Sequence, residues 1–164
     1  MVNVLLLKQL CQWLLLGGFA AWFVQCNYTN DYDDDDFRTR LNVLDVFQQA
    51  SSTFSAGEDV TFQLTLTNRS NRDLRFRFNS GQKHEFFVFS EDSDVPLWQW
   101  SVAESLVFTQ AHSSQLVRED NSWTVSYTWN QQTTDGENVA AGRYRVVGRF
   151  IGVATEERFI QILN

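Results

Sequence analysis

VTFQLTLT, residues 60–67, alternates strictly between apolar side chains and hydroxyl or amide side chains. In an extended strand successive side chains point to opposite faces, so this period of two gathers the apolar groups on one face. A strand with one apolar and one polar face is typical of an antiparallel sheet that covers a core and faces water. The stretch therefore predicts a half-buried strand in an antiparallel sheet.

The same alternation returns in three more segments, at residues 74–78, 123–129 and 143–150. Glycine, asparagine and aspartate, which favour turns, separate these segments. Shorter runs predict five further strands, at residues 42–48, 84–89, 95–100, 114–118 and 156–162. About nine short strands at this spacing predict an all-β fold over residues 41–164, an immunoglobulin-like antiparallel β-sandwich.

The composition supports a well-packed domain and limits its partners. The 164 residues include 14 Phe, 6 Trp and 4 Tyr, and the formal net charge is −7. An acidic chain repels the phosphate backbone, so we expect no nucleic-acid binding through the overall field. Both cysteines, Cys11 and Cys26, precede the predicted domain, which therefore contains no disulfide framework.

Residues 1–26 are largely apolar and predict an N-terminal hydrophobic helix that acts as a signal peptide or a membrane anchor. The unbroken run at residues 13–24 has the length of a signal-peptide core and is short for a membrane span, which needs about 20 residues. Lys8 precedes this run and aspartates follow it, an asymmetry that favours export of the remaining chain. We therefore expect an extracytoplasmic domain, either membrane-anchored or secreted.

The apolar segment ends at Cys26, where a bacterial lipoprotein signal would place its lipidated cysteine. Gln25 precedes it, whereas such signals have a small residue at that position. Lipidation of Cys26, a retained anchor and a cleaved signal therefore all remain open. Residues 27–40 follow, with five aspartates between Asp31 and Asp36, and predict an acidic, solvated stalk.

Few side chains of the predicted domain could carry catalysis. The domain has two histidines, His84 and His112, and no cysteine, and no nucleophile-elbow motif surrounds a serine. Two separated histidines fall short of the three or four ligands of a zinc site. The sequence therefore predicts a protein that is not an enzyme and that uses no metal and no cofactor.

Two tryptophans are candidates for binding. Trp98 and Trp100 lie two positions apart, so in a strand they would share a face. That face is either the core or a surface platform of the kind found at protein interfaces and carbohydrate sites.

Arginines are the second candidate. Arg75 and Arg77 share the polar face of one predicted strand, and Arg143 and Arg145 share that of another. If the two strands belong to one sheet, these side chains form a local basic patch that could dock an acidic partner.

Several short motifs occur in an order and at a spacing that we recognise. They are Asn68-Arg-Ser70, Phe78-Asn-Ser-Gly-Gln82, Glu85-Phe86, Trp98-Gln-Trp-Ser101, Phe108-Thr-Gln110, Trp129-Asn130, Asp135-Gly136 and Val139-Ala-Ala-Gly-Arg-Tyr144. Together they resemble the BsuPI-type intracellular proteinase inhibitor family over roughly residues 58–152. The resemblance implies an immunoglobulin-like domain and a proteinase as partner.

The sequence therefore predicts an exported, membrane-tethered module that binds another protein, with proteinase inhibition as its most concrete form. An inhibitor needs a rigid exposed loop, and the candidate is the segment that begins at Ser101 and ends at Phe108. One alternative is a structural module of the cell envelope or a surface appendage, which would self-associate. A second is carbohydrate binding through Trp98 and Trp100.

Overall fold

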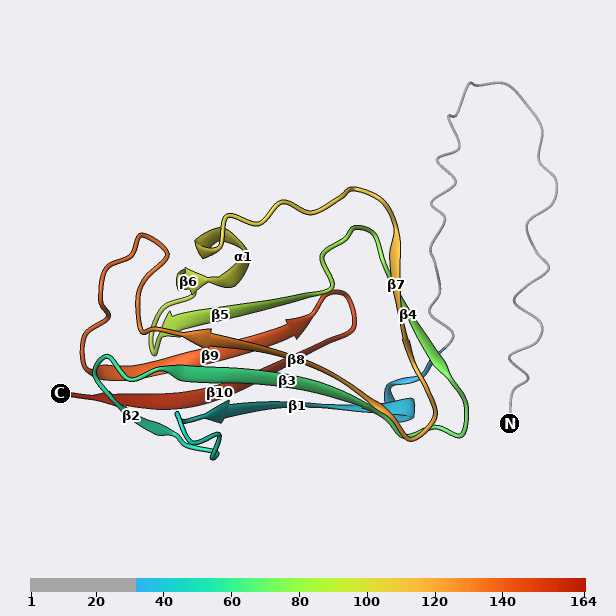
Figure 1. Ribbon diagram of the computed structural model, residues 1–164, viewed down its shortest axis with the longest axis horizontal. Coiled ribbons are helices and arrows are strands. Elements are labelled where there is room, and N and C mark those ends of the chain that lie inside the picture. The colour runs from blue at the N-terminus through green and yellow to red at the C-terminus, as the bar shows by residue number, and fades with distance from the viewer. Residues whose placement is uncertain (1–31) are drawn as a thin grey trace, which may run out of the picture.

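The computed structural model describes residues 32–164, and its regular structure is almost entirely β-strand (Figure 1). In chain order the elements are η2 (Asp34–Asp36), β1 (Phe37–Leu44), β2 (Thr53–Ser55), β3 (Val60–Asn68), β4 (Leu74–Phe78), β5 (His84–Ser90), β6 (Pro96–Gln99), α1 (Trp100–Ala103), β7 (Ser113–Val117), β8 (Ser122–Trp129), β9 (Gly142–Phe150) and β10 (Ala154–Leu163). The predicted all-β fold class is confirmed.

The N-terminal segment of residues 1–26, with its expected helix and Cys26, lies outside the described residues. Within residues 32–164 no helix is long and apolar enough to cross a membrane.

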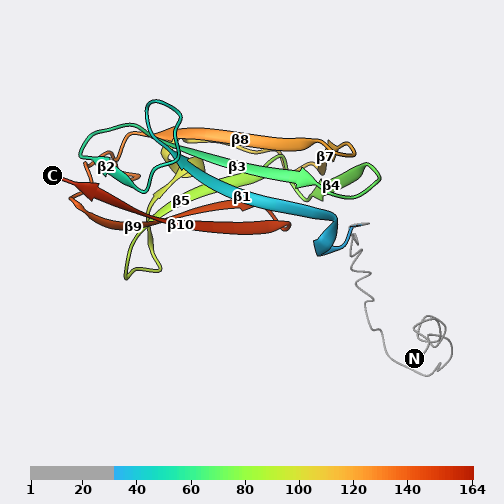
Figure 2. The ribbon, with the colours of Figure 1, turned by 90° about the horizontal axis from the view of Figure 1, so that it is seen from below.

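Two sheets lie face to face as layers, one ordered β1-β3-β8 and the other β2-β10-β9-β5-β6 (Figure 2). Their strand pairs are antiparallel, except that β2 runs parallel to β10. Aromatic side chains from both layers meet between them. The ring of Phe62 on β3 lies 6.0 Å from Phe86 on β5 and 6.1 Å from Trp98 on β6. Burial of an aromatic side chain such as Phe62 contributes roughly 2–3 kcal/mol, so this interlayer core holds the sandwich together.

The alternation in residues 60–67 has the predicted consequence. Val60, Phe62, Leu64 and Leu66 of β3 are all buried in the core. Their polar neighbours face outward and form hydroxyl pairs with β8, at 3.1 Å for Thr61–Thr128, 3.0 Å for Thr65–Thr124 and 2.9 Å for Thr67–Ser122. The predicted half-buried strand is confirmed.

Gly148 on β9 lets the two layers approach closely. A Cβ atom at this position would lie 3.2 Å from Cδ1 of Leu41 and 3.3 Å from Cδ1 of Leu64, on the facing sheet. Both leucines are buried and packed, so they could not move aside without disturbing the core. Only glycine fits here without strain.

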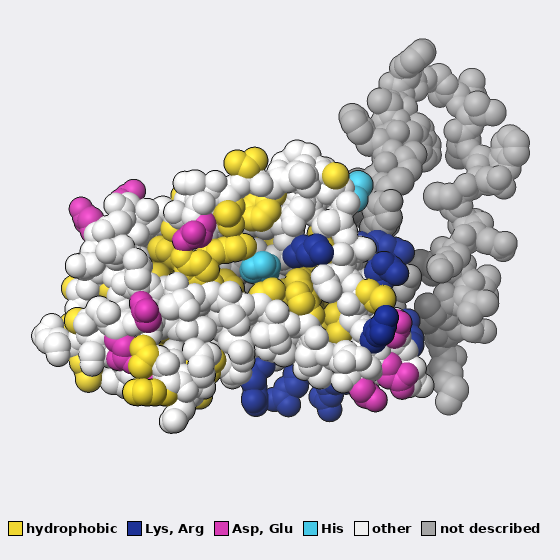
Figure 3. Space-filling view, in the orientation of Figure 1, with side chains coloured by type: hydrophobic (Ala, Val, Ile, Leu, Met, Phe, Trp, Pro, Cys, Tyr) yellow, Lys and Arg dark blue, Asp and Glu magenta, His cyan; other side chains and the backbone are white. Residues whose placement is uncertain are grey.

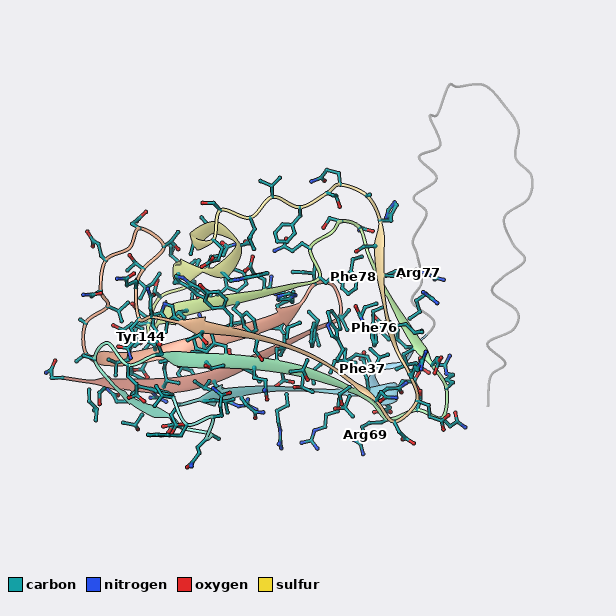
Figure 4. All side chains as sticks on the ribbon, in the orientation of Figure 1. Phe37, Arg69, Phe76, Arg77, Phe78 and Tyr144 are labelled. Carbon is teal, nitrogen blue, oxygen red and sulfur yellow. The ribbon has the colours of Figure 1, made fainter. Side chains whose placement is uncertain are left out.

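β4 and β7 form a separate two-stranded ribbon at one end of the sandwich. Phe76 and Phe78 point inward from β4, and Phe37 of β1 lies beside them, with ring centroids 5.5 Å apart for Phe37 and Phe76 (Figure 4). The ring of Phe78 contacts that of Trp123 on β8 at 6.0 Å. The ribbon therefore closes this end of the core.

Several boundaries differ from the prediction. β1 begins at Phe37, so the sheet includes residues that the sequence assigned to the acidic stalk of residues 27–40. The charges of Arg38 and Arg40 made this segment look like part of the stalk. These two side chains point outward from β1, and they alternate with side chains that point inward, among them Phe37 and Leu41. β2 was not predicted, because three residues are too few to show a period.

Candidate functional site

The segment between β6 and β7 begins with a single helical turn, α1, and then leaves the body of the protein. The turn ends in a Schellman arrangement, in which the N–H of Leu106 donates to the carbonyl of Ser101 at 2.9 Å and the N–H of Ser105 to that of Val102 at 3.0 Å. Ser105 has a φ of 51°, the left-handed conformation that this ending requires. The chain then continues to β7 without regular structure.

Apolar side chains are exposed along this segment, which we name the 101–108 loop. Val107 is 96% exposed, Val102 54% and Leu106 39%. Figure 3 shows hydrophobic side chains gathered on the surface at α1. Exposed apolar side chains gathered on one surface make this segment a candidate site of interaction with another molecule.

Glu85 of β5 anchors the start of the loop. Its side chain is only 2% exposed, and its carboxylate accepts hydrogen bonds from the backbone N–H of Ser101 at 3.0 Å and from the Ser101 hydroxyl. The side-chain amides of Gln82 and Gln99 donate to the same carboxylate at 2.9 Å and 3.1 Å. A buried carboxylate with this many donors ties the loop to a core strand, because each donor would be left unsatisfied if the loop moved away.

Aromatic rings pack against one another beneath the loop, on the side that faces the body of the domain. Trp100 stacks on His84 with centroids 4.5 Å apart and planes 20° apart, and it lies 6.4 Å from the ring of Phe108. Burial lowers the pKa of His84, and neighbouring charges have smaller effects. The imidazole is therefore neutral at pH 7, and the stack is an uncharged aromatic contact.

Tyr127 of β8 holds the middle of the loop. Its hydroxyl donates a short hydrogen bond to the carboxylate of Glu104, directly after α1. Burial raises the pKa of Tyr127 to about 12, and the hydrogen bond to Glu104 adds to the rise. The phenol therefore keeps its proton at neutral pH and remains the donor in this contact.

The far end of the loop is fixed at Gly81. The N–H of Gly81 donates to the carbonyl of Thr109 at 2.9 Å. A Cβ atom at position 81 would lie 2.8 Å from Oγ1 of Thr109, so a larger residue here would push against the Thr109 side chain. The 101–108 loop is therefore tied to β5 at its start and to the connection between β4 and β5 after its end, while Val107 is exposed between them.

The structure brings together three of the predicted binding residues. Trp100, Ser101 and Phe108 all belong to this loop and its support. Trp98 does not join them, because it is 3% exposed and lies in the core. Trp100 packs against the core from α1, and the rings of both tryptophans lie near that of Tyr127, at 5.2 Å for Trp98 and 6.3 Å for Trp100. Of the two interpretations of this pair, core packing is the one that Trp98 follows.

The predicted basic patch is not formed either. Arg75 and Arg77 lie on β4 in the two-stranded ribbon, whereas Arg143 and Arg145 lie on β9 in the five-stranded sheet. Arg143 pairs with Glu91 at 2.6 Å, and Arg145 lies 3.4 Å from Asp94 and 3.7 Å from Glu157. The patch required both strands in one sheet, and that condition is not met.

The sequence did not single out the anchor Glu85, although it belongs to one of the quoted motifs, or Val107, although it lies within the candidate loop. Glu85 follows a histidine at the start of a strand, where a charged side chain usually faces water, and nothing local shows that Ser101 and Gln99 will surround it. Val107 carries no signal by itself, because a single valine between two apolar residues also fits a core position. Its exposure follows from the anchors on either side.

Comparison with known proteins gives structural likenesses of low similarity. A β-glucosidase from Listeria innocua in complex with gluconolactone aligns with a TM-score of 0.44 and 12% identity over 78% of this chain and 16% of that one. A β-glucosidase from Erythrobacter marinus has a TM-score of 0.45 and 8% identity, over 77% and 15%. An alkylpurine DNA glycosylase from Pseudomonas fluorescens has a TM-score of 0.44 and 9% identity, over 79% and 31%. This chain therefore spans less than a third of each protein, and these likenesses carry no argument about its function.

No curated protein matches the chain. The model of one protein family does match, over residues 47–154, and that family is described as BsuPI, intracellular proteinase inhibitor. The description contradicts the extracytoplasmic localisation expected from the N-terminal segment, so that expectation is wrong. It was inferred from hydropathy and charge in residues that the structure does not describe, whereas the family match covers the folded domain.

The resemblance seen in the short motifs between Asn68 and Tyr144 is confirmed by this match. A family of inhibitors also implies a binding protein rather than an enzyme. The matched residues make up more than half of the sequence, so the chain belongs to the BsuPI family of intracellular proteinase inhibitors.

Proposed function

We propose that this protein inhibits a proteinase by placing residues 106–108 in its active-site cleft, with Val107 entering the pocket that selects the substrate side chain. The observation that carries the proposal is the exposure of Val107, 96%, between two ends that are hydrogen-bonded to the rest of the domain, at Glu85 and at Gly81. A side chain that touches almost nothing in its own protein is free to fill a pocket in another.

Anchoring supports inhibition rather than cleavage. A flexible substrate loses conformational freedom when it binds, whereas a loop already fixed by Glu85, Tyr127 and Gly81 loses little. Such a loop therefore binds more tightly than a free peptide of the same sequence. After a cut, the same anchors would hold the two new ends together, which favours resealing over release.

The test is inhibition of an intracellular proteinase from the source organism, measured by hydrolysis of a chromogenic peptide. Val107→Asp should raise the inhibition constant by at least about 100-fold, because a carboxylate entering an apolar pocket is desolvated without a partner. Val95 is 73% exposed in a turn between β5 and β6, so Val95→Asp is a matched control that should change little. Equal inhibition by both variants would remove the 101–108 loop from the mechanism.

We also propose that the sandwich is immunoglobulin-like, as the sequence predicts. Two features support the assignment. β2 pairs with the last strand, β10, in parallel at the edge of a sheet ordered β2-β10-β9-β5-β6. The hydroxyl of Tyr144 on β9 donates to the carbonyl of Ala140 at 2.6 Å, in the manner of a tyrosine corner, at the end of the molecule opposite Phe76 (Figure 4).

The alternative of a structural assembly module stays a prediction. It requires self-association, which light scattering on the purified chain would detect.

A further inference from the structure

Three arginines share the outer surface of β1 and the end of β3. Arg38 and Arg40 point outward from β1, opposite Thr67 and Thr65 of β3, and Arg69 follows β3 directly. All three are exposed. We name this surface the arginine face. It lies on the side of the molecule away from α1 and the 101–108 loop (Figure 1).

The three arginines of this face make no ion pair within the described part of the chain. Other arginines have carboxylate partners, at 2.8 Å for Arg72–Asp36, 2.6 Å for Arg143–Glu91 and 3.8 Å for Arg158–Glu156. Among residues 32–164, no carboxylate lies within ion-pair distance of any of the three arginines of the face. The nearest acidic side chains are therefore neighbours and not partners: Asp34 and Glu156 line an adjacent concavity with Arg38 and Arg40.

The surface between these side chains is hollow and polar. A concavity of about 500 Å³ is lined by Arg38, Arg40, Asn42, Thr65, Thr67 and Arg69. Its floor consists of the outward threonines of β3, two of which are held by hydroxyl contacts to β8. In Figure 3, Lys and Arg side chains form a row along the lower edge, and Figure 4 shows Arg69 pointing away from the sandwich.

We propose that the arginine face docks a carboxylate-rich segment of a partner protein. Arg has a planar fork of donors that matches a carboxylate with two parallel hydrogen bonds, and the threonine hydroxyls can donate to the remaining oxygens. A negative protein with a local positive surface attracts a short acidic segment but repels a long polyanion. The outward side chains of β3 and β8 are threonine, serine and glutamine, so this surface offers no aromatic ring on which a base could stack. An acidic protein segment therefore fits better than nucleic acid.

The experiment titrates a fluorescein-labelled hexaglutamate peptide with the full chain and follows fluorescence anisotropy. We expect saturable binding at an ionic strength of about 0.01 M that weakens steeply at about 0.15 M, because exposed charge pairs are screened. The triple variant R38Q/R40Q/R69Q should weaken binding by about tenfold, since each exposed pair contributes a factor of about two.

The matched control is R72Q/R143Q/R158Q, which removes the same total charge from arginines that already have carboxylate partners. It should bind the peptide about as well as the unchanged protein does. Equal weakening by the two triple variants would overturn the proposal, because the overall field would then explain binding. Tighter binding of a single-stranded oligonucleotide or of phosphatidylserine vesicles than of hexaglutamate would overturn it too, as would no binding of the peptide at low salt. Circular dichroism checks that each variant is folded.

Discussion

The backbone N–H of Ser101 donates a 3.0 Å hydrogen bond to the buried carboxylate of Glu85 on β5. This contact joins the first residue of an exposed loop to a strand that has a neighbour on each side in the larger sheet. The loop therefore moves with the core and not independently of it. For an inhibitor that must hold one conformation in a proteinase cleft, the position of Glu85 matters as much as the residues that touch the partner.

Glu85→Gln tests this anchor. The glutamine keeps the shape of the side chain but replaces one acceptor oxygen with a donor, so it cannot satisfy both groups of Ser101 and the amide of Gln99. A buried unsatisfied donor costs about 1–3 kcal/mol, and we expect a loss of that size in the free energy of unfolding, measured with urea. Inhibition should weaken as well.

Glu91→Gln is the control for that change, because Glu91 lies in an exposed pair with Arg143. Its loss should alter stability by less than about 1 kcal/mol and leave inhibition unchanged. If both variants lose stability equally, Glu85 is not the anchor that its contacts indicate.

Gly81→Ala tests the far end of the loop. The added methyl group would lie 2.8 Å from Oγ1 of Thr109, so either Thr109 or the loop must move. Thr109 is exposed and its hydroxyl can rotate, so we expect a stability loss near the low end of the range for overpacking, about 1 kcal/mol, together with a higher inhibition constant. Gly142→Ala provides the comparison, because a Cβ there meets Tyr144 at an ordinary 3.8 Å and should be tolerated. Similar behaviour of the two variants would show that residue 109 gives way freely.

The pH dependence of stability should report the surroundings of Tyr127, first its burial and then its contact with Glu104. The pKa of Tyr127 is raised to about 12 in the folded protein, mainly by burial, and an unfolded tyrosine titrates near about 10. The contribution of Tyr127 to the free energy of unfolding is therefore fully present below pH of about 10. It is lost as the pH rises from about 10 to 12, where the tyrosine is ionised in the unfolded chain but still protonated in the folded one. Tyr127→Phe removes this contribution, so its melting temperature should fall less steeply across that window. Parallel curves for the variant and the unchanged protein would contradict the shift.

Most of the fold was predictable because its signal is local. The inward and outward halves of β3, β4, β8 and β9 follow directly from alternation, and a reader of the sequence needs only the period of two to find them. β1 was placed too late because the charges of Arg38 and Arg40 were taken for a stalk, although they occupy the wet face of a strand.

The site was predictable only in part, because its contacts join distant segments. The loop ending at Phe108 could be predicted because its residues show no alternation of apolar and polar side chains. Its anchor at Glu85 could not, because that contact depends on which strands become neighbours. The failed arginine patch has the same cause, since β4 pairs with β7 and not with the sheet of β9. The rings of Trp98 and Trp100 both lie near Tyr127, but a period of two could not show whether that side is core or surface.

Val107→Lys tests the identity of the inserted residue most sharply. If Val107 occupies the selecting pocket of the proteinase, that pocket is apolar, and an ammonium group entering it without a partner should weaken inhibition by at least about 100-fold. The same variant should gain inhibition of a proteinase whose pocket carries a carboxylate, because the lysine then finds a charge partner. Val95→Lys adds the same charge at another exposed valine and should produce neither change. A loss of the first activity without any gain of the second would show that residue 107 contacts the proteinase outside its selecting pocket, and an unchanged inhibitor would show that it makes no contact at all.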